Sequence, residues 1–237
     1  MSNEKRVILQ ERQFNHSFQP ICNIQSSDII GFEALFRSSL TPNPLTTFRQ
    51  ASNKGWLYEL EKLSIQKAIQ TFQSTLHDQD LKLYINIFPA TLLNKDFCQF
   101  INREVENNNL DRGKLVIEIN EPQVVITPKE LQQSVQLLKE EGYQIALDNI
   151  GNGASSFITI LDLDPDILKV DRGFSEEIHR STLKQKTLES LQQYCQITNT
   201  QLILEGIETT STLEAARQLN IEMAQGYYLG MPLPINQ

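Results

Sequence analysis

The sequence predicts an α/β fold, a (β/α) barrel of the TIM type with an irregular first hairpin. Strand-like apolar runs alternate with amphipathic helical segments along the whole chain, and six of these runs end in a residue that can hold a metal ion or a proton. The length of 237 residues is close to the roughly 250 that such a barrel usually needs. No break in composition divides the chain, so we expect residues 1–237 to form a single domain.

The first two predicted strands lie too close together in the sequence to be parallel. Residues 18–24 and 29–36 are both apolar, and the turn Ser26-Ser27-Asp28 separates them. A parallel crossover needs about a dozen residues, so we expect an antiparallel hairpin. Six further strands follow from short apolar runs between turn residues, at 82–88, 114–120, 144–150, 167–171, 201–207 and 223–229.

Helices are predicted between these strands from apolar residues at helical spacing. The clearest covers residues 57–76, and another begins at Thr127 and Pro128, which suit an N-cap and a first helical position, and stops at Gly142. The residues expected on their buried faces are Ile65, Ile69, Phe72, Leu76, Leu131, Val135 and Leu138. Further helices are predicted at 90–107, from the loop 151–153 to about 161, at 175–197 and at 211–219.

Composition excludes several classes of function. The formal net charge is −8 and no Lys/Arg run occurs, which argues against a DNA or RNA polymer as partner. No apolar run approaches the roughly 20 residues of a membrane span, and the N-terminus has no signal-peptide pattern, so we expect a soluble, cytoplasmic protein without a membrane partner. Cys22, Cys98 and Cys195 form no CxxC pair and are expected to be inert thiols. No GxGxxG or GxxxxGK[ST] motif indicates a dinucleotide or P-loop fold.

The polar ends of the apolar runs predict one shared site. Chemistry in a TIM-type barrel occurs at the C-terminal ends of the strands, and a charged group there costs free energy unless it is paired. Each residue alone would be interpreted as a solvated loop residue, a satisfied turn residue or half of an ion pair. Six in succession favour a common site. They are Glu33, Asn86, Glu118, Asp148, Lys169 and Glu205.

These residue types predict a site for hard cations. Four of them are carboxylates, Asn86 adds a neutral carbonyl oxygen, and no His or Cys accompanies them. Oxygen ligands select Mg²⁺, Mn²⁺ or Ca²⁺ over Zn²⁺. Two divalent ions can activate a bridging water and neutralise charge on a phosphate, and Lys169 can hold that water or a phosphate oxygen. The sequence therefore predicts hydrolysis of a phosphate ester.

The motifs around these residues identify a family resemblance that covers residues 18 to about 234. They are FQPI at 18–21, EALFR at 33–37, NIFP at 86–89, EINE at 118–121, DNIG at 148–151 followed by Ser155-Ser156, KVD at 169–171, EGIET at 205–209 and QGY at 225–227. One such tripeptide is a weak signal, whereas the ordered set is a strong one. On these motifs the chain resembles the EAL-domain family of cyclic di-GMP phosphodiesterases.

The resemblance implies a modified (β/α)₈ barrel with an antiparallel first strand, and Mg²⁺- or Mn²⁺-dependent opening of cyclic di-GMP to linear pGpG. The residues that it implies as ligands of the first metal are Glu33, Asn86, Glu118 and Asp148. Asp148 would bridge to the second metal, beside Glu205. The other roles that it implies are Lys169 for orienting the attacking water, Arg37 for a substrate phosphate, Gln19 and Gln225 for lining the site, and Glu121 for bracing the loop after Asp148. It also implies a homodimer.

One departure from the family pattern bears on activity. The family has two consecutive aspartates where this chain has Asp148-Asn149, and the second is a ligand of the second metal. Asn149 keeps a carbonyl oxygen but lacks the charge, so we expect a weaker second metal site and an active but slow enzyme. The alternative is a degenerate EAL domain that binds cyclic di-GMP or a protein without cleaving it. A weaker alternative is an enolase-like barrel in which Lys169 is a base beside Mg²⁺.

Overall fold

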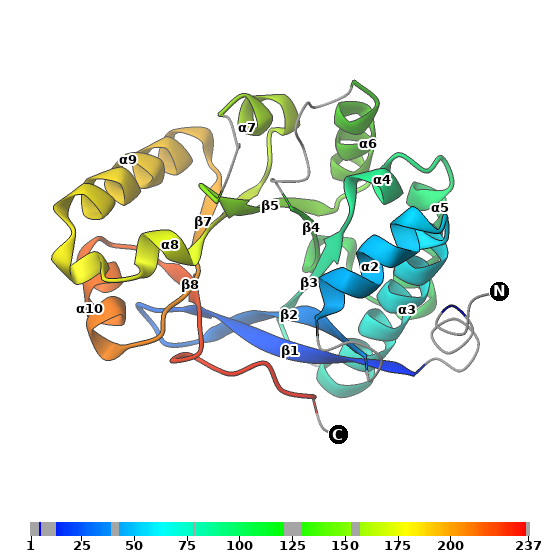
Figure 1. The fold of residues 1–237 in the computed structure, drawn as a ribbon, viewed down its shortest axis with the longest axis horizontal. Helices are drawn as coiled ribbons and strands as arrows, with labels where there is room; N and C mark the ends of the chain where they lie inside the picture. The colour runs from blue at the N-terminus through cyan, green and yellow to red at the C-terminus, as the bar shows by residue number, and fades with distance from the viewer. Residues whose placement is uncertain are drawn as a thin grey trace.

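The structure is a computed structural model that describes residue 5 and residues 13–38, 43–77, 79–120, 129–152 and 157–235. Eight strands close into a barrel in the sequence order β1 to β8, with helices around the outside (Figure 1). This confirms the predicted barrel. Within the described residues, no helix is both long enough and apolar enough to cross a membrane.

The strands confirm the predicted hairpin. They are β1 (Phe14–Asn23), β2 (Ile29–Ser38), β3 (Lys82–Ile87), β4 (Leu115–Asn120), β5 (Gln144–Ile150), β6 (Ile167–Val170), β7 (Gln201–Leu204) and β8 (Met223–Gln225). Strand β1 is antiparallel to both β2 and β8, and the other neighbours are parallel. Strand β1 begins four residues earlier than predicted because residues 14–17 pair with the end of β2. Strand β7 ends earlier because Gly206 turns the chain with a φ of 77°.

Two of the predicted helices are wrong because each is interrupted in the structure. The helices are α2 (Pro44–Asn53), α3 (Leu57–Leu76), α4 (Pro89–Leu92), α5 (Phe97–Asn107), α6 (Lys129–Glu140), α7 (Phe157–Leu163), α8 (Arg172–Ser175), α9 (Thr182–Thr198) and α10 (Thr210–Gln218). The predicted helix 90–107 is two helices, because the side chain of Asn94 accepts the Asp96 amide in a turn between them. The predicted helix 175–197 breaks at Glu177, which has left-handed backbone, and at Ser181, which caps α9.

The predictions for α3 and α6 agree with the structure where it describes these helices. Helix α3 has the predicted bounds, and the expected face of α6 is buried. The predicted start of α6 at residues 127–128 lies outside the described residues. Helix α2 was not predicted, although Asn43 and Pro44 form an N-cap and a first helical position.

The described residues form three buried apolar clusters. A side cluster joins α2 and α3 to β1 and β2 through Phe14, Phe36, Ala51, Trp56, Leu57 and Leu60, and the other two form the layers of the barrel. The larger lies between the strands and the outer helices. The smaller fills the floor of the barrel with Ile21, Tyr84, Val116, Ala146, Ile167 and Ile203. Gly31 permits this packing, since a Cβ there would lie 2.8 Å from the Tyr84 ring. The three cysteines are free, and Cys22 and Cys195 are buried.

Candidate active site

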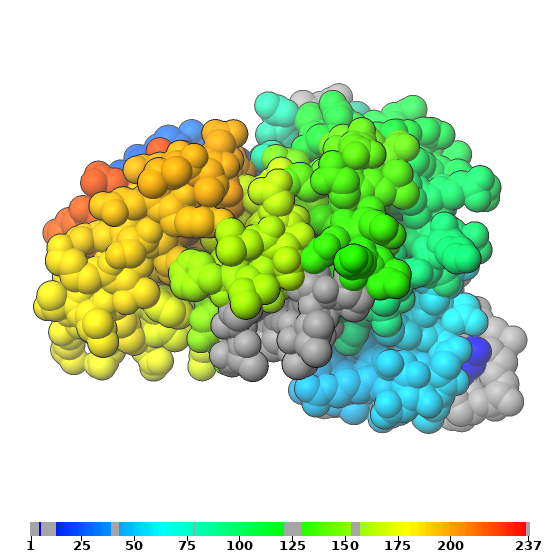
Figure 2. All heavy atoms as spheres, turned by 90° about the horizontal axis from the view of Figure 1, so that it is seen from above, coloured from blue at the N-terminus to red at the C-terminus, as the bar shows by residue number. Residues whose placement is uncertain are grey.

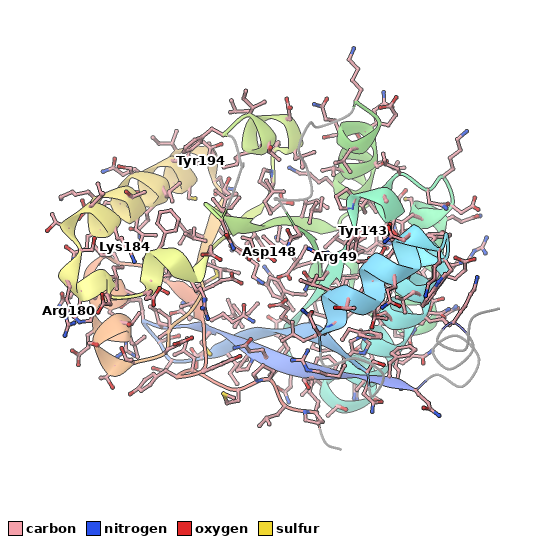
Figure 3. All side chains as sticks on the ribbon, viewed as in Figure 1. Arg49, Tyr143, Asp148, Arg180, Lys184 and Tyr194 are labelled. Carbon is pink, nitrogen blue, oxygen red and sulfur yellow. The ribbon has the colours of Figure 1, made fainter. Side chains whose placement is uncertain are left out.

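A polar layer lies directly above the apolar floor. Side chains along a strand alternate between two faces, so the residue two positions beyond an inward apolar one also points inward. On antiparallel β1 the equivalent residue is Gln19, two positions before the inward Ile21. On five parallel strands the position is polar: Asn86 of β3, Glu118 of β4, Asp148 of β5, Lys169 of β6 and Gln225 of β8. Glu205 occupies the corresponding position just after β7, and Glu33 of β2 pairs with Gln19. Figure 3 shows Asp148 at the end of β5, within the ring of strands.

Lys169 lies at the centre of this layer. Its side chain is fully buried, and its Nζ is 2.8 Å from Glu118 Oε1, 2.9 Å from Glu33 Oε2, 3.1 Å from Glu205 Oε1 and 3.7 Å from Asp148 Oδ1. The structure thus brings four of the six predicted strand-end residues around the ammonium group of a fifth, Lys169. The sixth, Asn86, donates from Nδ2 to Glu33 Oε1 at 2.7 Å.

The cluster distributes its charge unevenly. Burial raises the pKa of Glu33, but the Lys169 charge and hydrogen bonds from Lys169, Gln225 and Asn86 together lower it to about 2. Burial lowers the pKa of Lys169, but the surrounding carboxylates outweigh burial and raise it well above its usual value. Glu33 and Lys169 therefore form a charged pair at neutral pH.

The other carboxylates lack such compensation. Burial, followed by the charge of Glu33, raises the pKa of Glu118 well above its usual value. Burial and the charges of Asp148 and Glu33 raise the pKa of Glu205 to about 8, although Lys169 opposes the shift. Burial also raises the pKa of Asp148. One ammonium group cannot neutralise four carboxylates, so further positive charge would stabilise this site.

The donor set fits hard divalent cations. Among the described residues, Glu118 Oε2 and Asp148 Oδ1 are buried and accept no hydrogen bond. Within the same residues no three acidic, His or Cys side chains form a ready-made cage, and Lys169 Nζ lies between the carboxylates instead. Four carboxylates and the amide of Asn86 supply oxygen alone, which suits Mg²⁺ or Mn²⁺.

Asn149 lies beside this cluster in left-handed backbone. Its φ is 60°, a conformation that Asn and Asp adopt more readily than other side chains. Its Nδ2 donates to Asp148 Oδ2 at 2.5 Å. The Asn149 amide therefore forms a hydrogen bond with one carboxylate oxygen of Asp148, whereas a carboxylate at position 149 would repel that oxygen. Asn149 also lines a cavity of about 200 Å³ at the barrel mouth, together with Gln19, Glu205 and Gln225.

Two of the predicted substrate-binding residues, Gln19 and Gln225, line the same mouth, whereas Arg37 lines a second cavity. Gln225 donates from Nε2 to Glu33 Oε2 at 2.9 Å, and Gln19 donates from Nε2 to the Gly230 carbonyl at 3.3 Å. Arg37 is half-buried and donates from Nη1 to the Phe36 carbonyl at 2.9 Å. Glu121 lies outside the described residues, so its bracing role stays a prediction.

A side cavity that the sequence did not reveal adjoins the cluster. Its volume is about 340 Å³, and Glu33, Asn86 and Arg37 line it together with an aromatic wall. The wall consists of Phe36, Phe48 and Phe88, with Phe48 edge-on to Phe36 at 5.1 Å and stacked on Phe88 at 5.6 Å between ring centroids. Phe48 belongs to α2, so only the unpredicted helix could have indicated this wall.

Tyr84 is another residue that sequence reasoning missed. It is buried in the barrel floor, and its hydroxyl has no hydrogen-bond partner among the described residues. Burial and the charge of Glu118 raise its pKa. Strand alternation from Asn86 could have identified it as an inward side chain.

Comparison with known proteins decides the family. The family model described as EAL domain matches residues 3–232. The chain belongs to the EAL domain family. The resemblance found in the sequence motifs is thereby confirmed.

Two relatives of this EAL domain are named for different activities, one as a phosphodiesterase and one as an antirepressor. It is 28% identical to "Probable cyclic di-GMP phosphodiesterase PdeI" of Escherichia coli strain K12 over 229 residues, which are 92% of this chain and 29% of PdeI. It is 26% identical to "Blue light- and temperature-regulated antirepressor BluF" of the same organism over 211 residues, 89% of this chain and 52% of BluF. The chain thus spans about a third of PdeI and half of BluF.

Solved structures confirm the fold of the EAL domain. The calcium and cyclic di-GMP complex of Klebsiella pneumoniae BlrP1 matches with a TM-score of 0.87 and 23% identity, covering 95% of this chain and 57% of that one. A manganese and cyclic di-GMP complex of BlrP1 matches with a TM-score of 0.83 and 24% identity, covering 91% and 55%. At this level of identity the likeness shows the fold.

Proposed function

We propose that this EAL domain hydrolyses cyclic di-GMP to linear pGpG with two divalent cations, Mg²⁺ or Mn²⁺. The observation that carries the proposal is the convergence of four carboxylates and Asn86 around the buried Lys169 at the barrel mouth. Membership of the family and the metal complexes of BlrP1 support it. The enolase-like alternative is disfavoured by the family membership.

The residues of the site would divide the work. Glu33, Asn86, Glu118 and Asp148 would hold the first ion, and Asp148, Asn149 and Glu205 would hold the second. The ions would lower the pKa of a bridging water and neutralise charge on the phosphate. Lys169 keeps its proton because the carboxylates raise its pKa, so its Nζ can donate a hydrogen bond to the attacking water.

The side cavity and Arg37 would hold the substrate. Among the described residues that line that cavity, Arg37 is the only arginine or lysine, and a guanidinium suits a phosphate. The Phe88 and Phe48 rings present faces on which a purine base can stack. Gln19 and Gln225 would line the opposite side of the mouth.

A second candidate function rests on Asn149. If the second ion binds too weakly, the domain would bind cyclic di-GMP or a protein partner with little or no hydrolysis. The hydrogen bond from the Asn149 side-chain amide to Asp148 favours this candidate, because an amide there contributes no negative charge. The name of BluF, an antirepressor, also fits a relative that acts through binding.

A turnover assay tests the first candidate. Purified protein is incubated with cyclic di-GMP and Mg²⁺ or Mn²⁺, and pGpG is quantified by chromatography. We expect pGpG with either ion, more slowly with Mg²⁺, and none from Glu33→Ala or Lys169→Ala. Turnover retained by either variant would contradict the assignment.

Calorimetry with cyclic di-GMP, together with the pGpG assay, separates the slow enzyme from the binding module. The binding module predicts saturable heat with cyclic di-GMP and no pGpG even at high Mn²⁺. The slow enzyme predicts pGpG that accumulates in proportion to enzyme concentration.

We further propose that the domain forms a homodimer through α7. Phe157, Ile158 and Leu161 of this helix are each more than 60% exposed, and the Phe157 ring contacts that of Tyr194 on α9. Helices α7 and α9 lie side by side on one face of the molecule (Figure 2). Light scattering should give twice the mass of the chain, and Ile158→Glu should give the monomer. A monomer at high concentration would contradict this.

We also propose a cytoplasmic location and no DNA or RNA polymer as partner. The free thiols fit a reducing compartment such as the cytoplasm. The net charge of −8 disfavours DNA and RNA polymers.

A further inference from the structure

Glu61 is a buried carboxyl group outside the site described above. It lies on α3, on the outer side of the barrel, and is 1% exposed. Its Oε1 accepts the Phe88 backbone N–H at 2.9 Å, and its Oε2 accepts the Thr91 hydroxyl. No charged group of the described residues shifts its pKa, which burial raises to about 8. Glu61 thus has hydrogen bonds to one short segment and no compensating cation.

That segment joins β3 to α4 and needs an external partner. Phe88 is the N-cap residue of α4, and its side chain cannot cap the helix. Helix α4 has only four residues, too few to be stable on its own. The carboxyl group of Glu61 supplies acceptors for Phe88 and Thr91 from a neighbouring helix, so it ties the start of α4 to α3.

The same segment carries two groups of the proposed site. Asn86 precedes Phe88 by two residues and donates to Glu33 at 2.7 Å. The Phe88 ring stacks on Phe48 in the wall of the side cavity. An anchor at the Phe88 amide therefore fixes the direction of both side chains.

We propose that Glu61 is a positioning residue that holds Asn86 toward the metal site and the Phe88 ring toward the substrate base. This inference rests on the proposed function. A carboxyl group meets the requirement because it has two oxygens, one for the amide and one for the hydroxyl. Glutamine can replace it, accepting through Oε1 and donating through Nε2 to Thr91, whereas leucine can do neither.

The test compares Glu61→Leu with Glu61→Gln in the full chain. Mn²⁺ binding is measured by electron paramagnetic resonance without nucleotide, and exchange of the Phe88 amide is measured by NMR in the metal-free protein. We expect Glu61→Leu to bind Mn²⁺ at least tenfold more weakly, to lose protection at Phe88 and to shift the Asn86 side-chain amide signals. Glu61→Gln should stay within threefold of the unmodified protein in affinity and keep both NMR signatures.

Gln66→Leu is the matched control on the same helix. Gln66 donates to Glu104 of α5 at 2.9 Å, so this variant also breaks a contact between helices but leaves the β3–α4 segment intact. It should bind Mn²⁺ as the unmodified protein does. If Glu61→Leu does not fold, Thr91→Val removes one of the two contacts and should weaken Mn²⁺ binding by a smaller factor.

Three results would overturn the inference. They are a folded Glu61→Leu with unchanged Phe88 exchange and Asn86 signals, an equal loss of Mn²⁺ affinity in Gln66→Leu, and a Glu61→Gln as impaired as Glu61→Leu. If the unmodified protein binds no Mn²⁺, the proposed function fails, and the two NMR signatures alone decide whether Glu61 positions Asn86 and Phe88.

Discussion

The two halves of the barrel mouth are built differently. On the side of β2 to β4, Glu33 accepts hydrogen bonds from Asn86, Lys169 and Gln225, and Glu118 is fully buried. On the side of β5 to β7, the Glu205 side chain is 20% exposed, and Asn149 donates to the neighbouring Asp148. The first half is therefore fixed by protein contacts before any ion binds, whereas the second depends more on the ion itself. Under the proposed function, preorganisation at one metal position and weak charge at the other is the arrangement expected of a slow enzyme.

The largest effect should come from the first half. Glu118→Gln removes a carboxyl group that would ionise to hold the first ion, and metal stabilisation of several kcal/mol corresponds to roughly a thousandfold in rate. The metal-free protein should be no less stable than before, since burial and Glu33 already raise the pKa of Glu118. The turnover assay with Mn²⁺ and urea unfolding in chelator measure the two effects, and calorimetry with Mn²⁺ measures the affinity for the ion. Unchanged Mn²⁺ binding would show that the first half is not the tighter site.

Arg37→Ala should separate substrate binding from metal binding within the same half. A hydrogen bond to a charged group contributes about 1.5–3 kcal/mol, so KM should rise roughly 10- to 100-fold. Mn²⁺ affinity should not change. Arg37→Lys keeps the charge but loses the planar fork, and its KM should be intermediate. An equal loss of Mn²⁺ affinity in Arg37→Ala would instead place Arg37 in the support of the metal site.

The sequence predicted the strand ends far better than their surroundings. Strand alternation has a period of two, so Asn86, Glu118 and Asp148 follow from the apolar runs that precede them. Their convergence on Lys169 Nζ depends on the width and tilt of the closed barrel, which no local pattern specifies. The four short distances from Lys169 could therefore not be anticipated in detail.

Contacts between outer elements were harder still to predict. Helix α2 supplies Phe48 to the side cavity, but its polar sequence gives a weak apolar stripe. Glu61 lies within the well-predicted helix α3, yet its bonds to Phe88 and Thr91 depend on how α3 packs against the end of β3. Helical spacing places Glu61 four residues before Ile65 on the buried face, but only tertiary packing shows which groups its carboxyl oxygens meet there.

Asn149→Asp should narrow the difference between the halves. Aspartate tolerates the left-handed backbone at this position about as well as asparagine, so the fold should not change. An added carboxylate raises the affinity of an oxygen site for divalent cations, and we expect about a tenfold gain in turnover at limiting Mn²⁺. Asn152→Asp is the control, because that side chain points to Asp171 instead, at 3.2 Å. A gain in the control and none in Asn149→Asp would refute the assignment of the second site.

The smallest effect on activity should come from Glu61→Gln, because Glu61 contacts the segment after β3 and not the site itself. The same variant should have a distinct effect on stability. Burial raises the pKa of Glu61 from 4.5 to about 8, so the folded state retains a proton that the unfolded state loses between these values. The contribution of Glu61 to the free energy of unfolding is therefore complete below about pH 4.5 and falls as the pH rises toward 8, by at most about 1.4 kcal/mol per pH unit. Glutamine carries no such proton.

Urea unfolding of both proteins in chelator, from pH 5 to 9, measures this difference. The unmodified protein should lose stability relative to Glu61→Gln up to about pH 8, and the two stability curves should run parallel above it. The site carboxylates are common to both proteins and cancel in the difference, so parallel curves throughout would mean that Glu61 is ionised in the folded state. The support of the first half would then be an anion instead of a neutral acid.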